Sequence, residues 1–234
     1  MKVGVIPARY AATRLLGKPL VDLGGQTMIE RVWRAASTAT TLDHVLVATD
    51  DDRIADVVRG FGGDAEITDP NLPSGTDRCY AAIVQRGWKP SIVVNIQGDE
   101  PLLQAQVVDD LVLCVQKGHC DVATPIQRIA DATELLTQSV VKVAVAQDLH
   151  ALYFTRAAIA TQWKHVGLYA YTWQALNRHI TTAPSLLEGA EKLEQLRLLE
   201  AGARFVCVET TVPFRAIDTP GDIEPVLRLL ALKG

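Results

Sequence analysis

Short apolar runs alternate along the first hundred residues with longer segments of helical period. Three runs rich in Val, Leu and Ile predict buried strands, at residues 3–6, 45–48 and 92–96. The segments between them predict helices near residues 28–37, 53–59 and 77–86. This order is typical of repeated βαβ units, so we expect an α/β fold with a mostly parallel sheet. Ligands of such sheets bind at the carboxyl ends of the strands.

The middle of the chain departs from this order. Its apolar runs are too close together for crossover helices and predict strands at residues 140–146, 151–154 and 166–171. We therefore expect a single domain over residues 1–234, with a small antiparallel excursion at about residues 140–175. That excursion would serve as a lid or as a dimer contact.

Helix-start signals return towards the end of the chain. Ser185 and Glu188 have the spacing of a capping box before a leucine-rich helix at residues 185–200. A last helix is expected to open with Thr219, Pro220 and Asp222. Earlier in the chain, three carboxylates where a helix begins are assigned mainly to capping, namely Asp50, Asp51 and Asp52.

The composition narrows the class of protein. Hydrophobic residues make up 48% of the chain, and the net charge of −4 argues against a general nucleic-acid binder. No apolar run approaches the roughly 20 residues that cross a bilayer, and the first residues lack the pattern of a secretory signal. The four cysteines include no CxxC pair, which favours reduced thiols over structural zinc. We expect a cytoplasmic protein without nucleic-acid or membrane partners.

The first candidate site is a basic loop after the first strand, VIPARYAATRLLGKPL at residues 5–20. Arg9, Arg14 and Lys18 are spaced through it, and residues 1–21 contain no acidic side chain. Arginine forks and a lysine ammonium suit phosphate oxygens. Neither a Walker loop nor a GxGxxG motif is present. The composition alone fits a solvated basic loop equally well.

The second candidate site consists of carboxylates at two distant strand ends. Asp99 follows the strand at residues 92–96 and could hold Mg²⁺, although a simple helix cap is the alternative. Glu100 is expected to support the next helix start. Asp218 lies just before the expected cap Thr219, so capping does not explain it. Asp99 and Asp218 could therefore share one cation.

Three weaker signals complete the candidates. The segment SGTDR at residues 74–78 combines a flexible glycine with an expected Thr76 cap and backbone amides that suit a nucleotide. Near His165, strand alternation predicts a pocket-facing side and a core side. The pocket-facing side carries His165, Gly167, Tyr169 and Tyr171. A later helix carries polar residues that could be merely solvated, namely Glu191, Glu194 and Gln195.

These segments, taken in order, resemble the 3-deoxy-manno-octulosonate cytidylyltransferase family, the CMP-Kdo synthetases of lipopolysaccharide precursor synthesis. The matching stretches span nearly the whole chain: IPARYAATRLLGKPL, SGTDR, VVNIQGDEP, VKVA, ALYFTRAAI, HVGLYAY, LEQLRLLEAG and IDTPGD. The resemblance implies a Rossmann-like nucleotidyltransferase fold, a homodimer, and the use of CTP with Mg²⁺ to activate the acidic sugar Kdo with release of pyrophosphate.

The resemblance also implies roles for particular residues. It places the nucleotide beside Arg9, Arg14, Lys18, Ser74 and Arg78. It assigns the metal to Asp99 and Asp218, which with Arg14 and Lys18 form the catalytic set. The sugar would meet Gln97, Arg156, His165, Tyr169, Glu194 and Gln195. The sugar hydroxyl would attack the α-phosphorus in line, so catalysis would rest on positioning and charge neutralisation.

The sequence leaves other functions open and departs from the family pattern at three places. Another acidic sugar, such as an 8-amino Kdo analogue or a nonulosonic acid, is the nearest alternative substrate. A nucleotide-binding regulatory protein without catalysis is a further alternative. Leu16 stands where proline is usual, Asp77 stands where glutamate is usual, and the connection between Ile159 and His165 is shorter than in relatives.

Overall fold

The computed structural model describes residues 1–11 and 14–231, and these residues form two compact units. The first unit holds residues 1–90, 94–109 and those from 212 onward. The second unit holds residues 91–93 and 110–211. The single domain expected from the sequence stays a prediction.

The first unit is built on a parallel sheet. Its strands are β1 (Lys2–Ala8), β2 (His44–Thr49), β3 (Asp64–Ile67) and the end of β4 (Ile92–Asn95). They are neighbours in the order β3-β2-β1-β4. The β1 and β2 strands run parallel with Val3 opposite His44, and β2 runs parallel to β3 with Leu46 opposite Asp64. The strands predicted at residues 3–6, 45–48 and 92–96 are confirmed.

The helices of the first unit begin at side-chain caps. The unit contains α1 (Met28–Ser37), α2 (Asp52–Gly60), α3 (Gly75–Gln85) and α9 (Ile223–Ala231), with short 3₁₀ turns η1 (Lys18–Leu20) and η2 (Pro220–Asp222). Thr27 caps α1 and Asp51 caps α2. The predicted Thr76 cap is wrong, because Ser74 accepts the hydrogen bond from the Asp77 backbone at the start of α3. Thr219 and Asp222 form the capping box that precedes α9, as predicted.

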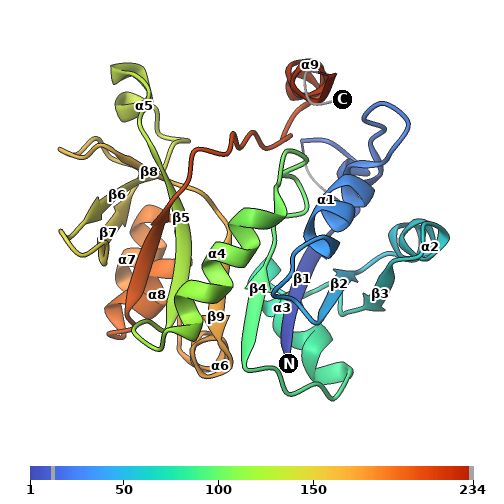
Figure 1. Ribbon diagram of the computed structural model, residues 1–234, viewed down its shortest axis with the longest axis horizontal. Coiled ribbons are helices and arrows are strands. Elements are labelled where there is room, and N and C mark those ends of the chain that lie inside the picture. The colour runs from blue at the N-terminus through green and yellow to red at the C-terminus, as the bar shows by residue number, and fades with distance from the viewer. Residues whose placement is uncertain (12–13, 232–234) are drawn as a thin grey trace. The chain divides into compact units, whose positions relative to one another are not determined.

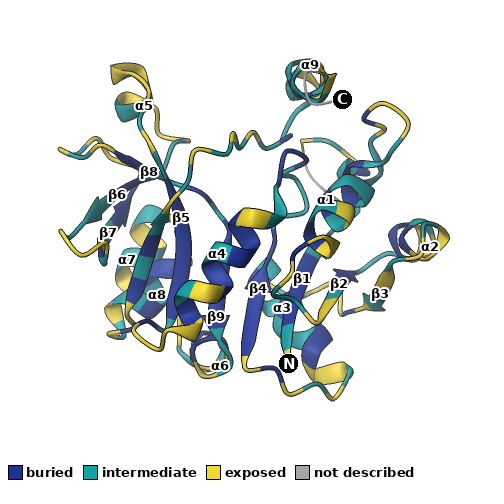
Figure 2. Ribbon diagram, viewed as in Figure 1, coloured by how far each residue is buried: buried dark blue, intermediate teal, exposed yellow. Residues whose placement is uncertain are grey.

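The strands β1, β2 and β4 of the first unit are mostly buried, whereas the edge strand β3 is largely accessible and the helices are amphipathic. In Figure 2, β1 and β4 are dark blue along most of their length, whereas α2 carries an exposed yellow side. A separate small core holds the C-terminal segment, because Ile217 and Val226 pack with Leu23, Met28 and Leu102. This core places the segment that carries Asp218 beside the residues that follow β4. Figure 1 shows α1 and α3 lying alongside β1.

The second unit is largely antiparallel. Its strands are β5 (Val122–Arg128), β6 (Lys142–Val145), β7 (Ala151–Thr155), β8 (Trp163–His165), β9 (Tyr169–Thr172) and β10 (Phe205–Glu209). They are neighbours in the order β9-β5-β8-β6-β7, with β10 beside β5. Only the pairing of β10 with β5 is parallel among these described pairs. The predicted antiparallel excursion is confirmed, and it extends to β5, before residue 140.

The helices of the second unit are short. They are α5 (Ala132–Leu136), α6 (Trp173–Thr181), α7 (Leu186–Glu191) and α8 (Gln195–Glu200), and the boundary between the units falls within α4 (Ala105–Gln116). Among the described residues, no helix is both long and apolar enough to span a bilayer.

Two predicted elements are each divided in the structure. The strand expected at residues 166–171 is interrupted before β9, because the Thr124 hydroxyl donates to the carbonyls of Val166 and Leu168, at 3.3 and 2.8 Å. The helix expected at residues 185–200 is two helices, since Lys192 adopts a left-handed conformation with φ of 54°. The capping box of Ser185 and Glu188 is present at the start of α7, as predicted.

Candidate active site

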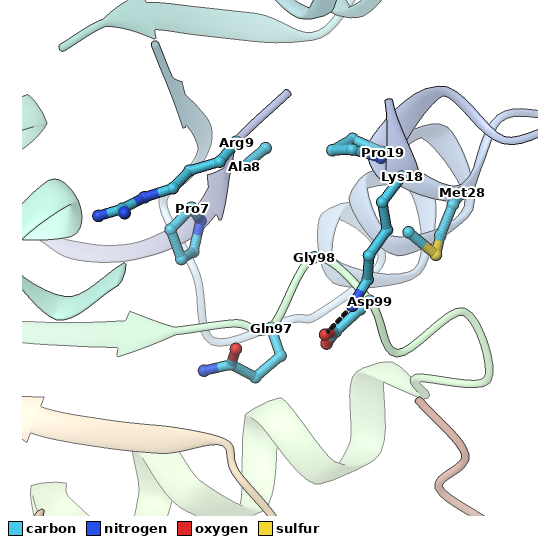
Figure 3. A pocket seen from close by; sticks show the side chains of 9 residues that line it. All are labelled: Pro7, Ala8, Arg9, Lys18, Pro19, Met28, Gln97, Gly98 and Asp99. Carbon is cyan, nitrogen blue, oxygen red and sulfur yellow. Dashed lines mark hydrogen bonds and ion pairs between the residues drawn. The ribbon is translucent and has the colours of Figure 1, made fainter. Parts of the chain in front are cut away.

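A pocket lies at the carboxyl end of β1 in the first unit. Its volume is about 160 Å³, and its walls come from the end of β1, from η1 and from the turn after β4. The lining residues are Pro7, Ala8, Arg9, Lys18, Pro19, Met28, Gln97, Gly98 and Asp99 (Figure 3). Gly98 allows the close approach of the two strand ends, because a Cβ there would lie 3.1 Å from the Pro7 carbonyl oxygen.

Lys18 brings two distant carboxylates together beside this pocket. Its Nζ donates to Asp99 Oδ2 at 2.6 Å and to Asp218 Oδ1 at 2.9 Å. Figure 3 shows the lysine side chain reaching from η1 to Asp99. Burial alone would lower the pKa of Lys18, but the two carboxylates outweigh it and raise the pKa above its ordinary value. Lys18 is therefore a charged ammonium shared by both carboxylates.

Arg14 adds a second positive charge to this cluster. Its Nη2 lies 3.1 Å from Asp218 Oδ1, and its side chain is 65% exposed. The position of Asp218 is fixed by backbone contacts on both sides. The Ile217 amide donates to the Asp99 carbonyl at 3.0 Å, and the Asp218 amide donates to Asp222 Oδ2 at 3.1 Å. The structure thus brings together all four residues of the predicted catalytic set: Arg14, Lys18, Asp99 and Asp218.

The Asp99 and Asp218 carboxylates suit a divalent cation. They already share one cation, the ammonium of Lys18, so their oxygens face a common position. Hard oxygen ligands from one or two carboxylates are what Mg²⁺ usually takes from a protein, with water and phosphate completing its shell. No group of three His, Cys, Asp or Glu side chains within residues 1–11 and 14–231 is arranged to hold a metal. The pair fits a metal that is completed by a substrate.

The prediction that Glu100 supports the start of the next helix is wrong. Its Oε2 is buried and has no hydrogen-bond partner within the described part of the chain, while α4 begins only at Ala105. Burial, together with the neighbouring charge of Asp99, raises the pKa of Glu100 to about 8.

The basic loop is held to the sheet by contacts that the sequence did not reveal. The Gly17 amide donates to the Tyr10 carbonyl at 3.0 Å, with Gly17 in the left-handed region at φ of 67°. The Arg53 guanidinium lies over the Tyr10 ring, 3.4 Å from its centroid. Tyr10 N also donates to Asp50 Oδ1 at 3.4 Å. Ala12 and Thr13 of the predicted loop lie outside the described residues.

Asp50 connects this loop to a buried arginine. Arg78 Nη2 donates to Asp50 Oδ2 at 3.1 Å, and Arg78 Nη1 donates to Thr68 Oγ1 at 2.6 Å. The Arg78 side chain is fully buried, and burial lowers the pKa of its guanidinium. The capping predicted for the cluster of Asp50, Asp51 and Asp52 is confirmed at Asp51, whereas Asp50 pairs with Arg78 instead. The pairing of Asp50 with Arg78 could not be predicted, because the three adjacent carboxylates are alike in sequence.

Two further predicted nucleotide residues also make protein contacts. Arg9 donates to the carbonyl of Leu72, and in Figure 3 its guanidinium points away from the Lys18–Asp99 pair. Ser74 caps α3 and donates from its hydroxyl to Asp77 Oδ2 at 2.6 Å. Arg9, Ser74 and Arg78 therefore lie around the carboxyl ends of the first unit's strands, but outside the charged cluster.

The second unit brings His165 and Tyr169 side by side. Their ring centroids are 5.3 Å apart, and the His165 ring also packs edge-on against Phe154 at 5.0 Å. His165 Nε2 lies 2.9 Å from Thr124 Oγ1. Burial lowers the pKa of His165 to about 3, and burial together with the Glu194 charge raises the pKa of Tyr169. Both rings are uncharged in this environment.

Arg156 is held by Glu191, which the sequence left open as a solvated residue. The Glu191 carboxylate accepts from Thr155 Oγ1 at 2.6 Å and from the Arg156 amide at 2.8 Å. Arg156 Nε donates back to the Glu191 carbonyl at 3.1 Å. Lys142, fully buried, donates to the Arg156 carbonyl at 2.6 Å. Glu191 and Lys142 thus fix the backbone from which Arg156 extends.

The other predicted sugar residues are divided between the units. Gln97 lines the pocket of the first unit. In the second unit, Gln195 is 2% exposed, and its Nε2 has no hydrogen-bond partner among the described residues. Glu194 lies 3.9 Å from His179 Nε2. A buried amide nitrogen without a hydrogen-bond partner marks a position where an acceptor group of a ligand could bind.

Comparison with known proteins identifies the family. Residues 3–205 match the cytidylyltransferase family. A 3-deoxy-manno-octulosonate cytidylyltransferase of Myxococcus xanthus is 42% identical over 241 residues, which cover 99% of this chain and 97% of the relative. A protein of the same name from a Bradyrhizobium species is 45% identical, with 97% and 96% of the two chains covered.

Solved structures agree with the sequence matches. The structure of CMP:2-keto-3-deoxy-manno-octonic acid synthetase complexed with CTP has a TM-score of 0.94 and 38% identity, covering 100% of this chain and 99% of that one. A Leptospira borgpetersenii cytidylyltransferase has a TM-score of 0.68 at 16% identity and shares the fold. The predicted nucleotidyltransferase fold is confirmed.

The sheet and the charged pocket at its carboxyl edge are those of a nucleotidyltransferase, which is the class of enzyme that the matches define. The chain belongs to the cytidylyltransferase family and, within it, to the 3-deoxy-manno-octulosonate cytidylyltransferases. The resemblance carried by the sequence motifs is confirmed.

Proposed function

We propose that this chain transfers CMP from CTP to the anomeric hydroxyl of 3-deoxy-D-manno-octulosonate, forming CMP-Kdo and releasing pyrophosphate. The observation that carries the proposal is the meeting of Lys18, Asp99 and Asp218 at the edge of the β1 pocket. The relatives of that name, at 42% and 45% identity, support the choice of nucleotide and sugar.

Mg²⁺ is part of this proposal, with Asp99 and Asp218 as its protein ligands. Their shared position on the Lys18 ammonium is the support from geometry. When bound, Mg²⁺ would neutralise charge on the reacting phosphates and help to align them. The rest of the mechanism depends on what the chain's own side chains do.

The cationic side chains would bind and orient the triphosphate. Lys18 and Arg14 provide positive charge where pyrophosphate develops as the leaving group. Arg9 and the amides at the Ser74 end of α3 are proposed to contact the nucleotide. Arg78 is proposed to act through Asp50, because its guanidinium is buried and paired. No covalent protein intermediate is required, since the sugar hydroxyl attacks phosphorus directly.

The sugar is proposed to be positioned by neutral and charged polar groups. His165 and Tyr169 would offer uncharged polar edges, while Arg156 would pair with the sugar carboxylate. The remaining members of the proposed sugar set are Gln97, Glu194 and Gln195. Glu191 and Lys142 support Arg156 from behind and therefore influence sugar binding only indirectly.

The test follows pyrophosphate release from CTP with a panel of acidic sugars. We expect rapid release with Kdo and Mg²⁺, slow release with an 8-amino Kdo analogue or a nonulosonic acid, and none after chelation of the metal. A preference for another sugar would replace Kdo as the substrate. CTP binding without pyrophosphate release for every sugar and metal tested would favour a regulatory nucleotide-binding protein.

A homodimer and a cytoplasmic location complete the proposal. Both rest on the family resemblance. Light scattering on the purified chain should give twice the mass of 25.4 kDa, and a mass of one chain would remove the dimer from the proposal. Fractionation of the producing cells should recover the activity with the cytoplasmic enzymes.

A further inference from the structure

Three of the four cysteines lie in the second unit, and two of them line one cavity. Cys114 is in the last turn of α4, Cys120 precedes β5, and Cys207 is in the middle of β10. The cavity has a volume of about 600 Å³, and both Cys114 and Cys207 contribute to its wall. Leu113 and Leu149, two large exposed apolar side chains, line the same cavity. Small molecules can therefore reach this wall from solvent.

Cys114 and Cys120 are in direct contact. The Cys120 thiol donates to the Cys114 carbonyl oxygen at 3.9 Å, so it lies against Cys114. The turn between the end of α4 and β5 brings them together. Cys120 is buried at 3% exposure, whereas Cys114 is half-buried. Of these two thiols, only that of Cys114 belongs to a residue that lines the cavity.

The environments of the three thiols differ in ways that matter for reactivity. The hydrogen bond from Cys120 lowers the pKa of Cys114 to about 7, and the charges of Lys117 and His150 act in the same direction. Burial raises the pKa of Cys207 to about 12, so its thiol stays protonated. Because the thiolate is the reactive form, Cys114 is the nucleophile of the group.

We propose that Cys114 and Cys120 are a site of reversible oxidation, at which a hydroperoxide entering the cavity converts the pair to a disulfide. This site is independent of nucleotide transfer and uses none of the residues proposed for that reaction. Its contact geometry supplies both a nucleophile open to the cavity and a second thiol within reach.

The chemistry takes two steps. The Cys114 thiolate attacks one peroxide oxygen, so that an S–O bond forms, the O–O bond breaks, and hydroxide or alkoxide leaves and takes up a proton. The Cys120 thiol then attacks the Cys114 sulfur, the S–S bond forms, and the S–O bond breaks with release of water. The two thiols together lose two electrons and two protons, and the peroxide is reduced. A small dithiol returns the pair to its starting state.

The chain offers a direct test by peptide mapping. Lys117 lies between the two cysteines, so tryptic cleavage after Lys117 places Cys114 and Cys120 on different peptides. After treatment of the full chain with hydrogen peroxide and alkylation of the remaining thiols, we expect these two peptides to be joined. Dithiothreitol should separate them. Two cysteines, Cys79 and Cys207, should be recovered in alkylated form.

Matched variants separate the pair from the cavity itself. Cys207→Ser should form the same joined peptides, since Cys207 only lines the wall. Cys120→Ser should give none, with Cys114 recovered as a sulfinic acid. Untreated chain should show Cys114 alkylated at neutral pH at least about 10-fold faster than Cys207.

Other outcomes would overturn the proposal. A wild-type chain that yields no joined peptides over a range of peroxide concentrations has no such site. Joining of Cys114 to Cys207 would instead show that the cavity wall, and not the turn, supplies the second thiol. Since the mapping is decisive on the wild-type chain, the result stands even where a serine variant folds poorly.

Discussion

The two units collect polar side chains in opposite ways. In the first, Lys18 lies between Asp99 and Asp218, and Arg14 pairs with Asp218 beside solvent. In the second, the His165 ring packs against aromatic rings and makes its polar contact with a neutral hydroxyl. The first cluster is charged and partly exposed, and the second is uncharged and enclosed. The first should therefore respond to charge removal, and the second to changes in protonation.

The difference reflects what each cluster is proposed to bind. A triphosphate with a metal brings several charges, which charged side chains can meet without a large desolvation cost when water is close. An enclosed site gains more from neutral groups, because a buried charge without a partner is costly. The predictions below test this contrast.

The largest effect is expected from removing charge at the first cluster. Asp99→Asn should lower kcat by at least about 100-fold, because one of the two carboxylates proposed to hold the metal is lost. The free energy of unfolding should change by about 1 kcal/mol or less, since Lys18 keeps Asp218 as its partner. Pyrophosphate release and chemical denaturation are the two measurements.

Asp56→Asn is the matched control for this substitution. Asp56 is an exposed carboxylate that pairs with Arg59 on α2 at 3.4 Å, away from the pocket. The Asp56→Asn substitution should leave both kcat and the free energy of unfolding unchanged. Near-normal turnover of Asp99→Asn at saturating Mg²⁺ would remove Asp99 from the metal site and leave the cluster as an ordinary ion-pair network.

A smaller effect is expected from removing the cation that the carboxylates share. Lys18→Gln should lower kcat by about 10-fold, because one positive charge is lost beside the leaving group. It should also leave Asp99 without the lysine cation and Asp218 with Arg14 alone, so Mg²⁺ should raise the melting temperature more than in the wild-type chain. Thermal melts with and without Mg²⁺ measure this difference.

The control for Lys18→Gln is Lys89→Gln, which changes an exposed lysine of the same unit. Its response to Mg²⁺ should equal that of the wild type. An equal response in Lys18→Gln would mean that the lysine and the metal do not compete for the carboxylates.

The first cluster was largely predictable from the sequence. A strand that ends in a carboxylate has a fixed destination in a parallel sheet, and Asp99 met that expectation. Asp218 was predictable because Thr219 already explained the helix start. The contact between Asp50 and Arg78 was not predictable, since it depends on which of three adjacent carboxylates points towards a buried helix face. Such a choice is made by tertiary packing and leaves no periodic signal.

The second unit was harder to predict for a related reason. Alternation correctly grouped His165 with Tyr169, but it implied one continuous strand with one core side and one side facing a pocket. Thr124 interrupts that strand by hydrogen-bonding to its carbonyls, and both sides are covered. Likewise, the leucine spacing of residues 185–200 could not show that Lys192 would take a left-handed conformation and divide the helix. Single side-chain contacts decided these cases.

The enclosed cluster should respond to acid. His165 stays neutral in the folded chain because burial lowers its pKa to about 3, whereas the unfolded chain takes up a proton there below about pH 6.5. The contribution of neutral His165 to the free energy of unfolding is therefore fully present above about pH 6.5 and is lost as the pH falls below that value. The loss should reach about 1.4 kcal/mol per pH unit. Denaturant unfolding between pH 7.5 and pH 5 measures it.

His165→Asn isolates this contribution. The variant should be less stable than the wild type at neutral pH, and the gap should narrow as the pH falls, since asparagine takes up no proton. His119→Asn, which changes an exposed histidine, should show the same pH dependence as the wild type. A gap that stays constant with pH would show that His165 is as accessible to protons when folded as when unfolded.

The smallest effect is expected where the basic loop is held in place. Arg53→Gln removes the guanidinium that lies 3.4 Å from the Tyr10 ring centroid. An exposed contact of this kind is worth about 0.5–1 kcal/mol, so KM for CTP should rise by about 3-fold while kcat stays nearly constant. Arg59→Gln is the control, because Arg59 lies on the same helix and forms an ion pair with the exposed Asp56. A fall in kcat with unchanged KM would show that Arg53 acts on the reaction itself and not by supporting the loop. Equal KM and kcat in the two variants would show that the loop is held without the contact between Arg53 and Tyr10.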